Sequence, residues 1–470
     1  MLFNSAIFLI LFVVFYLAYW PLPVRGKHIL IIIASFIFYG WYSFPFLLLF
    51  LFILFFSYYI SIPIVRHKSK AALAVGVGLL VLNLAFFKYF YLFAAGLGHL
   101  FGLEYLIDIR RNLQGDYGIE IILPIAISFY TFQIIAYLVD CYRGTISEQI
   151  ILRKYIVFIL YFPQFIAGPI MRSTDFIEQI DQPRATEDRM LNGSLLLLQG
   201  IFKKVLIADQ IGAVIGPVFQ RPESYDFTML IILIPGFISQ IYADFSGYTD
   251  MARGMSKLLG YEIPENFTGP FLSSSMSELW RRWHITLSTW LRDYIYFPLG
   301  GSRRGEAATY INLLVTMGLG GLWHGANWTM LVWGIYMGFI IAVERFMSQN
   351  KIRILPETLW AEGMRKFWTW FLFGISGILF ASPGIEQAFQ IFGGIAVGQR
   401  GSILARFGLV IVLCIVVLVF NYLQYSDRLK NWLGSRRGLR YALVGLGSIL
   451  ITLLVGMYGD TSGSFIYFSF

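Results

Sequence analysis

The sequence predicts an all-α membrane protein that crosses the bilayer many times, and two observations indicate this fold class. Of the 470 residues, 57% are hydrophobic and only 13% are charged, whereas about 25% of the residues in a soluble globular domain carry a charge. Apolar runs of roughly 20 residues, the length that spans a bilayer as a helix, recur along the chain. A lipid bilayer is therefore the expected solvent for most of the chain.

The apolar runs predict about eleven to thirteen transmembrane helices, together with re-entrant and interfacial helices. Some runs are short or interrupted by Gly and Pro, and irregular backbone is tolerated at membrane depth only where protein or water satisfies its polar groups. Without internal repeats, residues 1–470 are expected to form a single membrane domain. Residues 1–22 lack a basic leader, so the first segment is expected to remain as a span. The predicted spans are residues 5–22, 28–42, 45–63, 72–97, 119–140, 154–171, 193–216, 227–247, 308–322, 327–347, 367–383, 404–424 and 441–458.

The charges in the early loops predict an orientation. If the N-terminus faces outward, the first three inside loops hold eight basic residues and the intervening outside loops hold two, Arg110 and Arg111. Because inside loops are enriched in Lys and Arg, this distribution favours an external N-terminus. The eight inside residues are Arg25, Lys27, Arg66, Lys68, Lys70, Arg143, Arg153 and Lys154.

Charge and cysteine usage narrow the possible functions. The net charge of +9 is scattered over short loops, a pattern typical of topology determinants and of contacts with anionic lipids, and no nucleic-acid partner is expected. Cys141 and Cys414 lie in separate apolar runs, so neither a disulfide framework nor a metal cluster is expected. No bound cofactor is predicted.

His324 is the residue best suited for chemistry. It lies between two apolar runs, in the segment Gly318-Leu-Gly-Gly-Leu-Trp-His-Gly-Ala-Asn-Trp328. An ionisable group inside a span is costly and marks a functional site by default, and imidazole takes and returns a proton near neutral pH. The nearby glycines allow a backbone or a substrate to approach closely. The alternative is a structural histidine bonded to a neighbouring helix.

His284 lies in a charged segment, Glu278-Leu-Trp-Arg-Arg-Trp-His-Ile-Thr-Leu-Ser-Thr-Trp-Leu-Arg-Asp-Tyr294. Read as one helix, it forms an apolar stripe that includes Trp280, Trp283 and His284. The segment is too charged to span and suits a helix at the membrane surface. Its arginines are suited to bind phosphate, and the alternative is anchoring to lipid headgroups. These residues, with two from the next loop, are Arg281, Arg282, Arg292, Arg303 and Arg304.

The remaining ionisable residues indicate structural roles. His28, His67 and His99 lie at span ends and are interpreted as interfacial histidines. Asp244 and Asp250 are six positions apart, so they do not share a helical face, and Arg253, three residues after Asp250, is expected to neutralise it. The forty-residue spacing of His284 and His324 matches no local metal motif, so no metal site is predicted.

Seven ordered motifs and the C-terminus resemble the membrane-bound O-acyltransferase family, and most closely its bacterial alginate O-acetyltransferase branch. The likeness covers residues 1–350 and resumes at the tail, while residues 351–460 read as generic membrane helices. The matching segments are Leu123–Gln133, Phe162–Arg172, Tyr242–Asp250, Pro264–Phe267, Trp280–Ser288, Trp290–Gly301, Gly321–Trp328 and Phe465–Phe470.

The resemblance implies helices arranged around a central tunnel, with an acyl donor reached from the cytoplasm and an acceptor reached from the other side. His324 matches the family's catalytic histidine and His284 matches the second histidine of the motif, so both are predicted as catalytic residues. His324 is expected to act as a base on a hydroxyl that attacks a thioester. The implied substrate-binding residues are Trp283, Arg281, Arg282, Arg292, Trp323 and Asn327, the arginines receiving the phosphates of a coenzyme A donor.

The function implied is transfer of acetyl from cytoplasmic acetyl-CoA to an extracytoplasmic partner protein of the SGNH type, for O-acetylation of an alginate-like exopolysaccharide. The expected location is the bacterial inner membrane, in contact with its lipids. D-alanyl transfer to teichoic acid and acyl transfer to peptidoglycan are enzymatic alternatives. A non-catalytic conduit or scaffold for a partner acetyltransferase is the alternative of another class.

Overall fold

The computed structural model describes residues 3–398, 405–458 and 465, and it is helical throughout, as predicted. Within the described residues no β-strand forms, and the one isolated bridge pairs Phe267 with Trp283. The chain packs into two compact units. Residues 14–184 and 261–263 make up most of the first unit, and residues 2–13, 185–260 and 264–470 make up the second.

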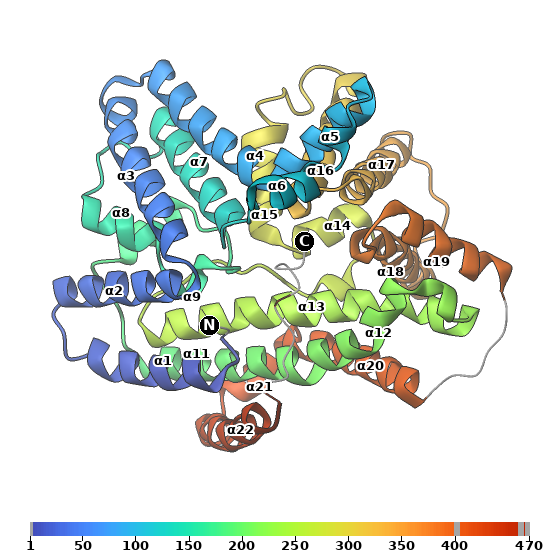
Figure 1. The fold of residues 1–470 in the computed structure, drawn as a ribbon. Helices are drawn as coiled ribbons and strands as arrows, with labels where there is room; N and C mark the ends of the chain where they lie inside the picture. Colours follow the sequence, from blue (N-terminus) through green and yellow to red (C-terminus); the bar gives the residue numbers. More distant parts are fainter. Residues whose placement is uncertain (1–2, 399–404, 459–464, 466–470) are drawn as a thin grey trace. The chain divides into compact units, whose positions relative to one another are not determined.

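The first unit is built around four long helices, which Figure 1 shows in blue and teal. Helix α4 packs against α3 and α7, and α3 also contacts α2 and α7. His28 lies on α2, fully buried, with Nε2 2.9 Å from the Ile180 carbonyl and Nδ1 3.1 Å from Arg153 Nε. This histidine therefore joins α2 to the segments that follow α7. The elements are α2 (Val24–Tyr42), α3 (Phe44–His67), α4 (Lys70–Phe101), α5 (Glu104–Ile107), α6 (Ile109–Tyr117), α7 (Ile127–Arg143), α8 (Leu152–Ile159), α9 (Phe162–Phe165), α10 (Ser173–Phe176) and η1 (Ile177–Gln179), preceded by α1 (Ala6–Tyr19).

The second unit surrounds α13 (Phe227–Leu258), a long helix packed against α11, α12, α18, α19 and α20. Figure 1 shows α11 and α12 running beside α13. The other elements are α11 (Glu187–Phe202), the π-helical turn η2 (Lys203–Ala208), α12 (Asp209–Gln220), η3 (Pro222–Ser224), η4 (Pro270–Leu272), α14 (Met276–Arg282), α15 (Ile285–Leu291), η5 (Arg292–Tyr296), α16 (Glu306–His324), α17 (Trp328–Gln349), α18 (Leu359–Ala381), α19 (Ile385–Val397), α20 (Ala405–Gln424), α21 (Asp427–Gly434) and α22 (Arg437–Tyr458).

Eight helices within the described residues are long and apolar enough to cross a membrane. They fall in eight of the thirteen predicted ranges. Their number is smaller than the eleven to thirteen crossings expected from the sequence. Two further apolar helices, α1 and α19, have 14 and 13 residues and are shorter than a full span. The chain is a multi-pass membrane protein.

Two predicted spans are wrong as continuous helices. The range 154–171 contains the end of α8 and the four-residue α9, because the chain leaves helical geometry at Leu160 and Tyr161. The range 119–140 becomes helical only at Ile127, after Ala126 takes a left-handed conformation with φ of 60°. Apolar composition alone does not reveal these interruptions, because both broken segments are as hydrophobic as a continuous span.

The acidic residues of α13 pair with lysines of η2 across the helix interface. Lys203 Nζ lies 2.8 Å from Asp250 Oδ2, and Lys204 Nζ lies 2.8 Å from Asp244 Oδ1. Arg253, predicted to neutralise Asp250, is instead 2.6 Å from Glu265. That prediction was wrong because Asp250 faces the interior, whereas Arg253 follows the helix surface toward the loop after α13.

Close approach of α16 and α17 depends on two glycines. A Cβ atom at Gly321 would lie 2.1 Å from the Met330 carbonyl oxygen, and one at Gly334 would lie 2.3 Å from the Met317 carbonyl oxygen. Any larger residue would push the helices apart, as expected where small residues line a helix interface. The glycine-rich segment before His324 therefore brings the end of α16 against α17.

Of the aromatic C-terminal motif, Phe465 is described, and residues 466–470 lie outside the described residues. Phe465 is buried, with its ring 4.9 Å from that of Tyr248 and 5.9 Å from that of Phe245. Phe465 thus packs on α13.

Candidate functional site

The segment predicted as one helix over residues 278–294 is broken at its centre. Helix α14 ends at Arg282 and α15 begins at Ile285, while Trp283 is extended and His284 adopts a left-handed conformation with φ of 43°. Residues 266–268 run alongside the break, where Thr268 N–H donates to the Arg282 carbonyl and Ile285 N–H donates to the Asn266 carbonyl, both at 3.0 Å. The continuous-helix prediction was wrong because a neighbouring segment replaces the hydrogen bonds within the helix.

Asn266 fixes the orientation of His284. Its Oδ1 accepts from Thr286 N at 3.2 Å and from Thr286 Oγ1 at 2.9 Å, and His284 Nδ1 lies 3.2 Å from the same oxygen. A backbone N–H can only donate, so this atom is the amide oxygen, and Nδ1 must carry the proton of a neutral imidazole. Nε2 then presents a lone pair.

His284 lies outside the eight candidate spans and is fully buried. Burial lowers the pKa of His284 to about 3, because removing the charged form from water is costly. The imidazole is therefore neutral near pH 7. A group with so low a pKa is a poor proton acceptor at that pH, so the geometry suits His284 to orient a neighbour rather than to act as a base.

His324 is the last residue of α16 and is 5% exposed. Aromatic rings surround its imidazole: ring centroids lie 5.2 Å away for Trp333, 5.1 Å for Phe380 and 5.0 Å for Trp323. The two histidines predicted from the sequence meet here, with ring centroids 6.3 Å apart. The structure thus brings together residues separated by forty positions.

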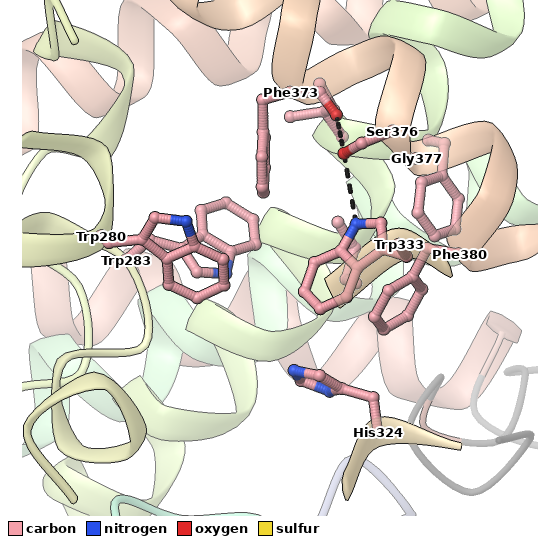
Figure 2. Close-up of a pocket in the computed structure, with 11 residues that line it drawn as sticks. Trp280, Trp283, His324, Trp333, Phe373, Ser376, Gly377 and Phe380 are labelled. Atoms are coloured by element: carbon pink, nitrogen blue, oxygen red, sulfur yellow. Dashed lines mark hydrogen bonds between the residues drawn. The ribbon is translucent and has the colours of Figure 1, made fainter. Parts of the chain in front are cut away.

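A pocket of about 350 Å³ opens beside His324. Figure 2 shows Trp280 and Trp283 on one side, Trp333 and Phe380 on the other, and the His324 ring directed toward the space between them. The lining residues are Phe237, Ile238, Ile241, Trp280, Trp283, His324, Trp333, Phe373, Ser376, Gly377 and Phe380.

Helix α18 secures one wall of this pocket. Ser376 Oγ accepts a hydrogen bond from Trp333 Nε1 at 3.2 Å and donates to the Phe373 carbonyl at 2.6 Å (Figure 2). The bond holds the indole whose ring stands perpendicular to His324, with an interplanar angle of 90°. Ser376 therefore restrains the imidazole indirectly, through Trp333.

The arginines predicted to bind phosphate do not line the pocket. Arg281 is exposed on α14, and Arg292 lies 2.7 Å from its neighbour Asp293. Arg282 donates to Glu278 at 3.1 Å and to the Thr268 carbonyl at 3.2 Å. Phosphate binding by these side chains stays a prediction.

Trp323 and Asn327 flank His324 with different structural contacts. Trp323 is buried, and its ring centroid lies 5.9 Å from that of His284 and 5.0 Å from that of His324, so it packs against both histidines. Asn327 is the N-cap of α17, and its Oδ1 accepts from Met330 N at 2.9 Å and from Thr329 Oγ1 at 2.7 Å. Capping employs the Asn327 oxygen to satisfy the first turn of the helix that carries Trp333.

Sequence reasoning missed the contribution of α18. Phe373, Ser376, Gly377 and Phe380 line the pocket, yet they lie in the stretch interpreted as generic membrane helix. A serine and two glycines within an apolar helix are the available signal, since small residues mark close helix contacts. Asn266 was also missed as a site residue, although it lies in the matched segment Pro264–Phe267.

Comparison with known proteins gives a family and several relatives. The sequence profile of MBOAT, the membrane-bound O-acyltransferase family, matches residues 145–354. The chain is 38% identical over 403 residues to the probable alginate O-acetylase AlgI of Pseudomonas aeruginosa, covering 83% of this chain and 74% of that protein. All pocket residues of α18 lie beyond the range matched by the family profile.

Two further relatives act on other acceptors, according to their names. A peptidoglycan O-acetyltransferase of Helicobacter pylori is 34% identical over 317 residues, covering 60% of this chain and 58% of the relative. A teichoic acid D-alanyltransferase of Streptococcus thermophilus is 26% identical over 313 residues, covering 59% and 72%. The chain is thus similar to acyl-transfer enzymes whose names give different acceptors.

Proposed function

Because this chain belongs to the membrane-bound O-acyltransferase family, we propose that it takes an acetyl group from cytoplasmic acetyl-CoA and passes it across the membrane for O-acetylation of an exopolysaccharide. The chain is an O-acyltransferase; the donor, the acceptor and the location in a bacterial inner membrane belong to the proposal. The similarity to an alginate O-acetylase over 83% of the chain supports an alginate-like acceptor. The proposed direct recipient is an extracytoplasmic SGNH-type protein.

The observation that carries the proposal is the imidazole of His324 bordering an aromatic pocket. A hydroxyl is a weak nucleophile until a base takes its proton, and His324 is the ionisable residue among those that line this pocket. The apolar walls exclude water, which strengthens polar interactions inside and limits hydrolysis of the thioester. In the proposed reaction His324 takes the hydroxyl proton and returns it to the departing thiolate.

His284 is proposed as a positioning residue. Asn266 orients its neutral ring. The centroid of this ring lies 4.6 Å from that of Phe245 and 6.3 Å from that of His324. Trp283 and Trp323 are proposed to contact substrate, Trp283 as part of the pocket wall. Arg281, Arg282 and Arg292 are proposed to meet the donor phosphates outside the pocket, and Asn327 to support the site by capping α17.

The test is transfer by the purified full-length protein in lipid nanodiscs, supplied with radiolabelled acetyl-CoA and either an acetylatable oligosaccharide or an SGNH-type partner. His324→Ala is expected to lower transfer by at least about 100-fold, the lower end of a general base's contribution. His67→Ala, an exposed histidine of the first unit, is the matched control and should retain full activity. Normal transfer by His324→Ala would overturn the catalytic assignment.

The same assay separates the alternatives. Transfer to peptidoglycan fragments but not to polysaccharide would favour the function named for the Helicobacter pylori relative. A requirement for a D-alanyl carrier thioester would favour the alanyl branch. If the protein neither binds nor consumes any thioester, and His324 variants leave a partner's transfer intact, a conduit or scaffold role would replace the enzymatic proposal.

A further inference from the structure

Few side chains inside the pocket can donate or accept a hydrogen bond, and two of them are bonded to each other. Trp333 Nε1 is bonded to Ser376, and the Ser376 hydroxyl is bonded to the Phe373 carbonyl. Among the side chains that line the pocket, Trp280 has a buried indole nitrogen, Nε1, with no hydrogen-bond partner within the described part of the chain. The pocket thus contains an indole N–H whose acceptor is missing.

A buried indole N–H without an acceptor lowers the stability of the folded protein. Trp280 is 9% exposed, and a buried tryptophan N–H usually finds a partner. A buried donor without a partner destabilises the fold, because its hydrogen bond to water is lost on burial and is not replaced. A phenylalanine would fill similar space without this cost, so the retained N–H indicates an acceptor that arrives with a ligand.

Trp280 is held rigidly, as a ligand-binding donor should be. The carboxylate of Glu344 on α17 accepts hydrogen bonds from Met276 N at 2.5 Å, and from Ser277 N at 2.9 Å and Ser277 Oγ at 2.7 Å, which anchors the start of α14. The other end of α14 is tied to Thr268 through the Arg282 carbonyl. The indole therefore cannot easily swing away from the pocket.

The indole and the proposed base contact the same ring. Trp280 packs edge-to-face on Trp333 with centroids 6.0 Å apart, and His324 packs perpendicular to Trp333 at 5.2 Å. A small group in the pocket lies between a hydrogen-bond donor and an imidazole. The lining contains no lysine or arginine, so stabilisation of a developing negative charge there must come from neutral donors.

From these contacts we propose that Trp280 Nε1–H donates a hydrogen bond to the carbonyl oxygen of the acyl thioester and stabilises the oxyanion formed on it. This inference rests on the proposed function. His324 takes the proton of the acceptor hydroxyl as its oxygen bonds to the carbonyl carbon, and the carbonyl electron pair moves onto oxygen. The carbon–oxygen double bond then re-forms, the carbon–sulfur bond breaks, and the thiolate leaves with the proton from His324.

The first experiment compares Trp280→Phe with wild type in the nanodisc assay. Loss of one oxyanion donor lowers kcat by about 10²–10³-fold in other acyl-transfer enzymes, and we expect a fall of about 100-fold with KM for acetyl-CoA changed by less than about threefold. Trp333→Phe is the matched control, because its N–H is already bonded to Ser376. We expect the control to lose less than about tenfold in kcat.

The second measurement detects the carbonyl contact directly. Two unreactive probes are compared by calorimetry: a ketone analogue of acetyl-CoA with a methylene in place of sulfur, and S-ethyl-CoA, which lacks the acyl carbonyl. Wild type and Trp333→Phe should bind the ketone more tightly than the thioether, and Trp280→Phe should bind both equally. A merely structural role for Trp280 would weaken both probes alike.

If Trp280→Phe does not fold, replacement of Trp280 by benzothienylalanine keeps the bicyclic ring and removes only the N–H. A kcat within threefold of wild type, or a preserved preference for the ketone probe, in either variant would overturn the proposal for Trp280. That result, with His324→Ala inactive, leaves the proposed function standing. A wild-type protein that neither binds nor uses acetyl-CoA would overturn both.

Discussion

Two successive stretches of α13 bury different kinds of side chain. Residues 237–241 contribute Phe237, Ile238 and Ile241 to a pocket without a permanent charge among its lining residues. Residues 244–250 contribute Asp244 and Asp250 to ion pairs with Lys204 and Lys203 of η2. The same helix therefore borders both an aromatic pocket and a buried layer of fixed charge.

The comparison of the pocket with the ion pairs shows where buried charge is tolerated in this protein. The Lys203 and Asp250 side chains are 2% and 6% exposed, and their mutual contact is supported by Gln199, 2.8 Å from Asp250, and Gln424, 3.0 Å from Lys203. Full neutralisation makes burial possible there. The residues that line the pocket include no lysine, arginine, aspartate or glutamate, and His324 is the ionisable side chain among them.

The largest effect on stability is expected from breaking one ion pair. Lys203→Met leaves Asp250 charged and buried, and removal of one partner of such a pair costs about 3–5 kcal/mol. We expect a lowered unfolding temperature and poor recovery of folded protein, measured by fluorescence-detected size exclusion in detergent. Lys203→Met combined with Asp250→Leu should regain at least half of the lost stability. A double variant as unstable as the single would show that the two charges do not act as a pair.

The next largest effect is expected at Asn266. Asn266→Ala removes the acceptor of His284 Nδ1 and two bonds from Thr286, and loss of a residue that orients a functional histidine costs roughly 10–100-fold. We expect kcat to fall in this range while KM changes little. Asn266→Asp keeps an acceptor oxygen and should restore most of the rate. Equal damage from both substitutions would indicate that packing, and not the orientation of His284, is what Asn266 provides.

A smaller effect, on the rate of transfer, is expected at Ser376 in the wall of the pocket. Ser376→Ala leaves the Trp333 N–H without its acceptor, and loss of one neutral hydrogen bond costs about 1 kcal/mol, or about fivefold in rate. Ser376→Thr keeps the hydroxyl and should recover activity. Ser382→Ala is the matched control, since this hydroxyl bonds to the Ile378 carbonyl of the same helix and does not line the pocket. The measurement is the steady-state rate with acetyl-CoA, which should fall for Ser376→Ala and stay near the wild-type rate for Ser376→Thr and Ser382→Ala.

The smallest effect is expected at Arg292, which belongs neither to the pocket lining nor to the ion pairs between α13 and η2. Its pair with Asp293 is solvent-exposed, and such pairs contribute at most about 1 kcal/mol. If the side chain meets donor phosphates, Arg292→Ala should raise KM for acetyl-CoA up to about fivefold and leave KM for S-acetylpantetheine, which lacks the nucleotide, unchanged. Equal shifts for both donors would remove Arg292 from phosphate binding.

The main elements of the site were predictable, but the connections between them were not. His324 is identified by its setting between two apolar runs, since an ionisable group in a span is costly, and His284 is identified by the aromatic motif that contains it. Their meeting at 6.3 Å depends on the break at Trp283. Local periodicity predicts a continuous helix there, because a stripe of Trp280, Trp283 and His284 fits 3.6 residues per turn.

By itself, the sequence determined the all-helical membrane fold and most of the spans, since hydrophobic composition and run length act locally and the bilayer reads them directly. It also determined the ordered motifs that carry the family likeness. Only the tertiary structure decided that Asp250 pairs with Lys203, that Asn266 orients His284 and that α18 closes the pocket through Ser376. Each of these contacts joins residues that are separated by 18 or more positions in the chain, and only tertiary packing, of helices and of the segment 266–268, brings their side chains within bonding distance.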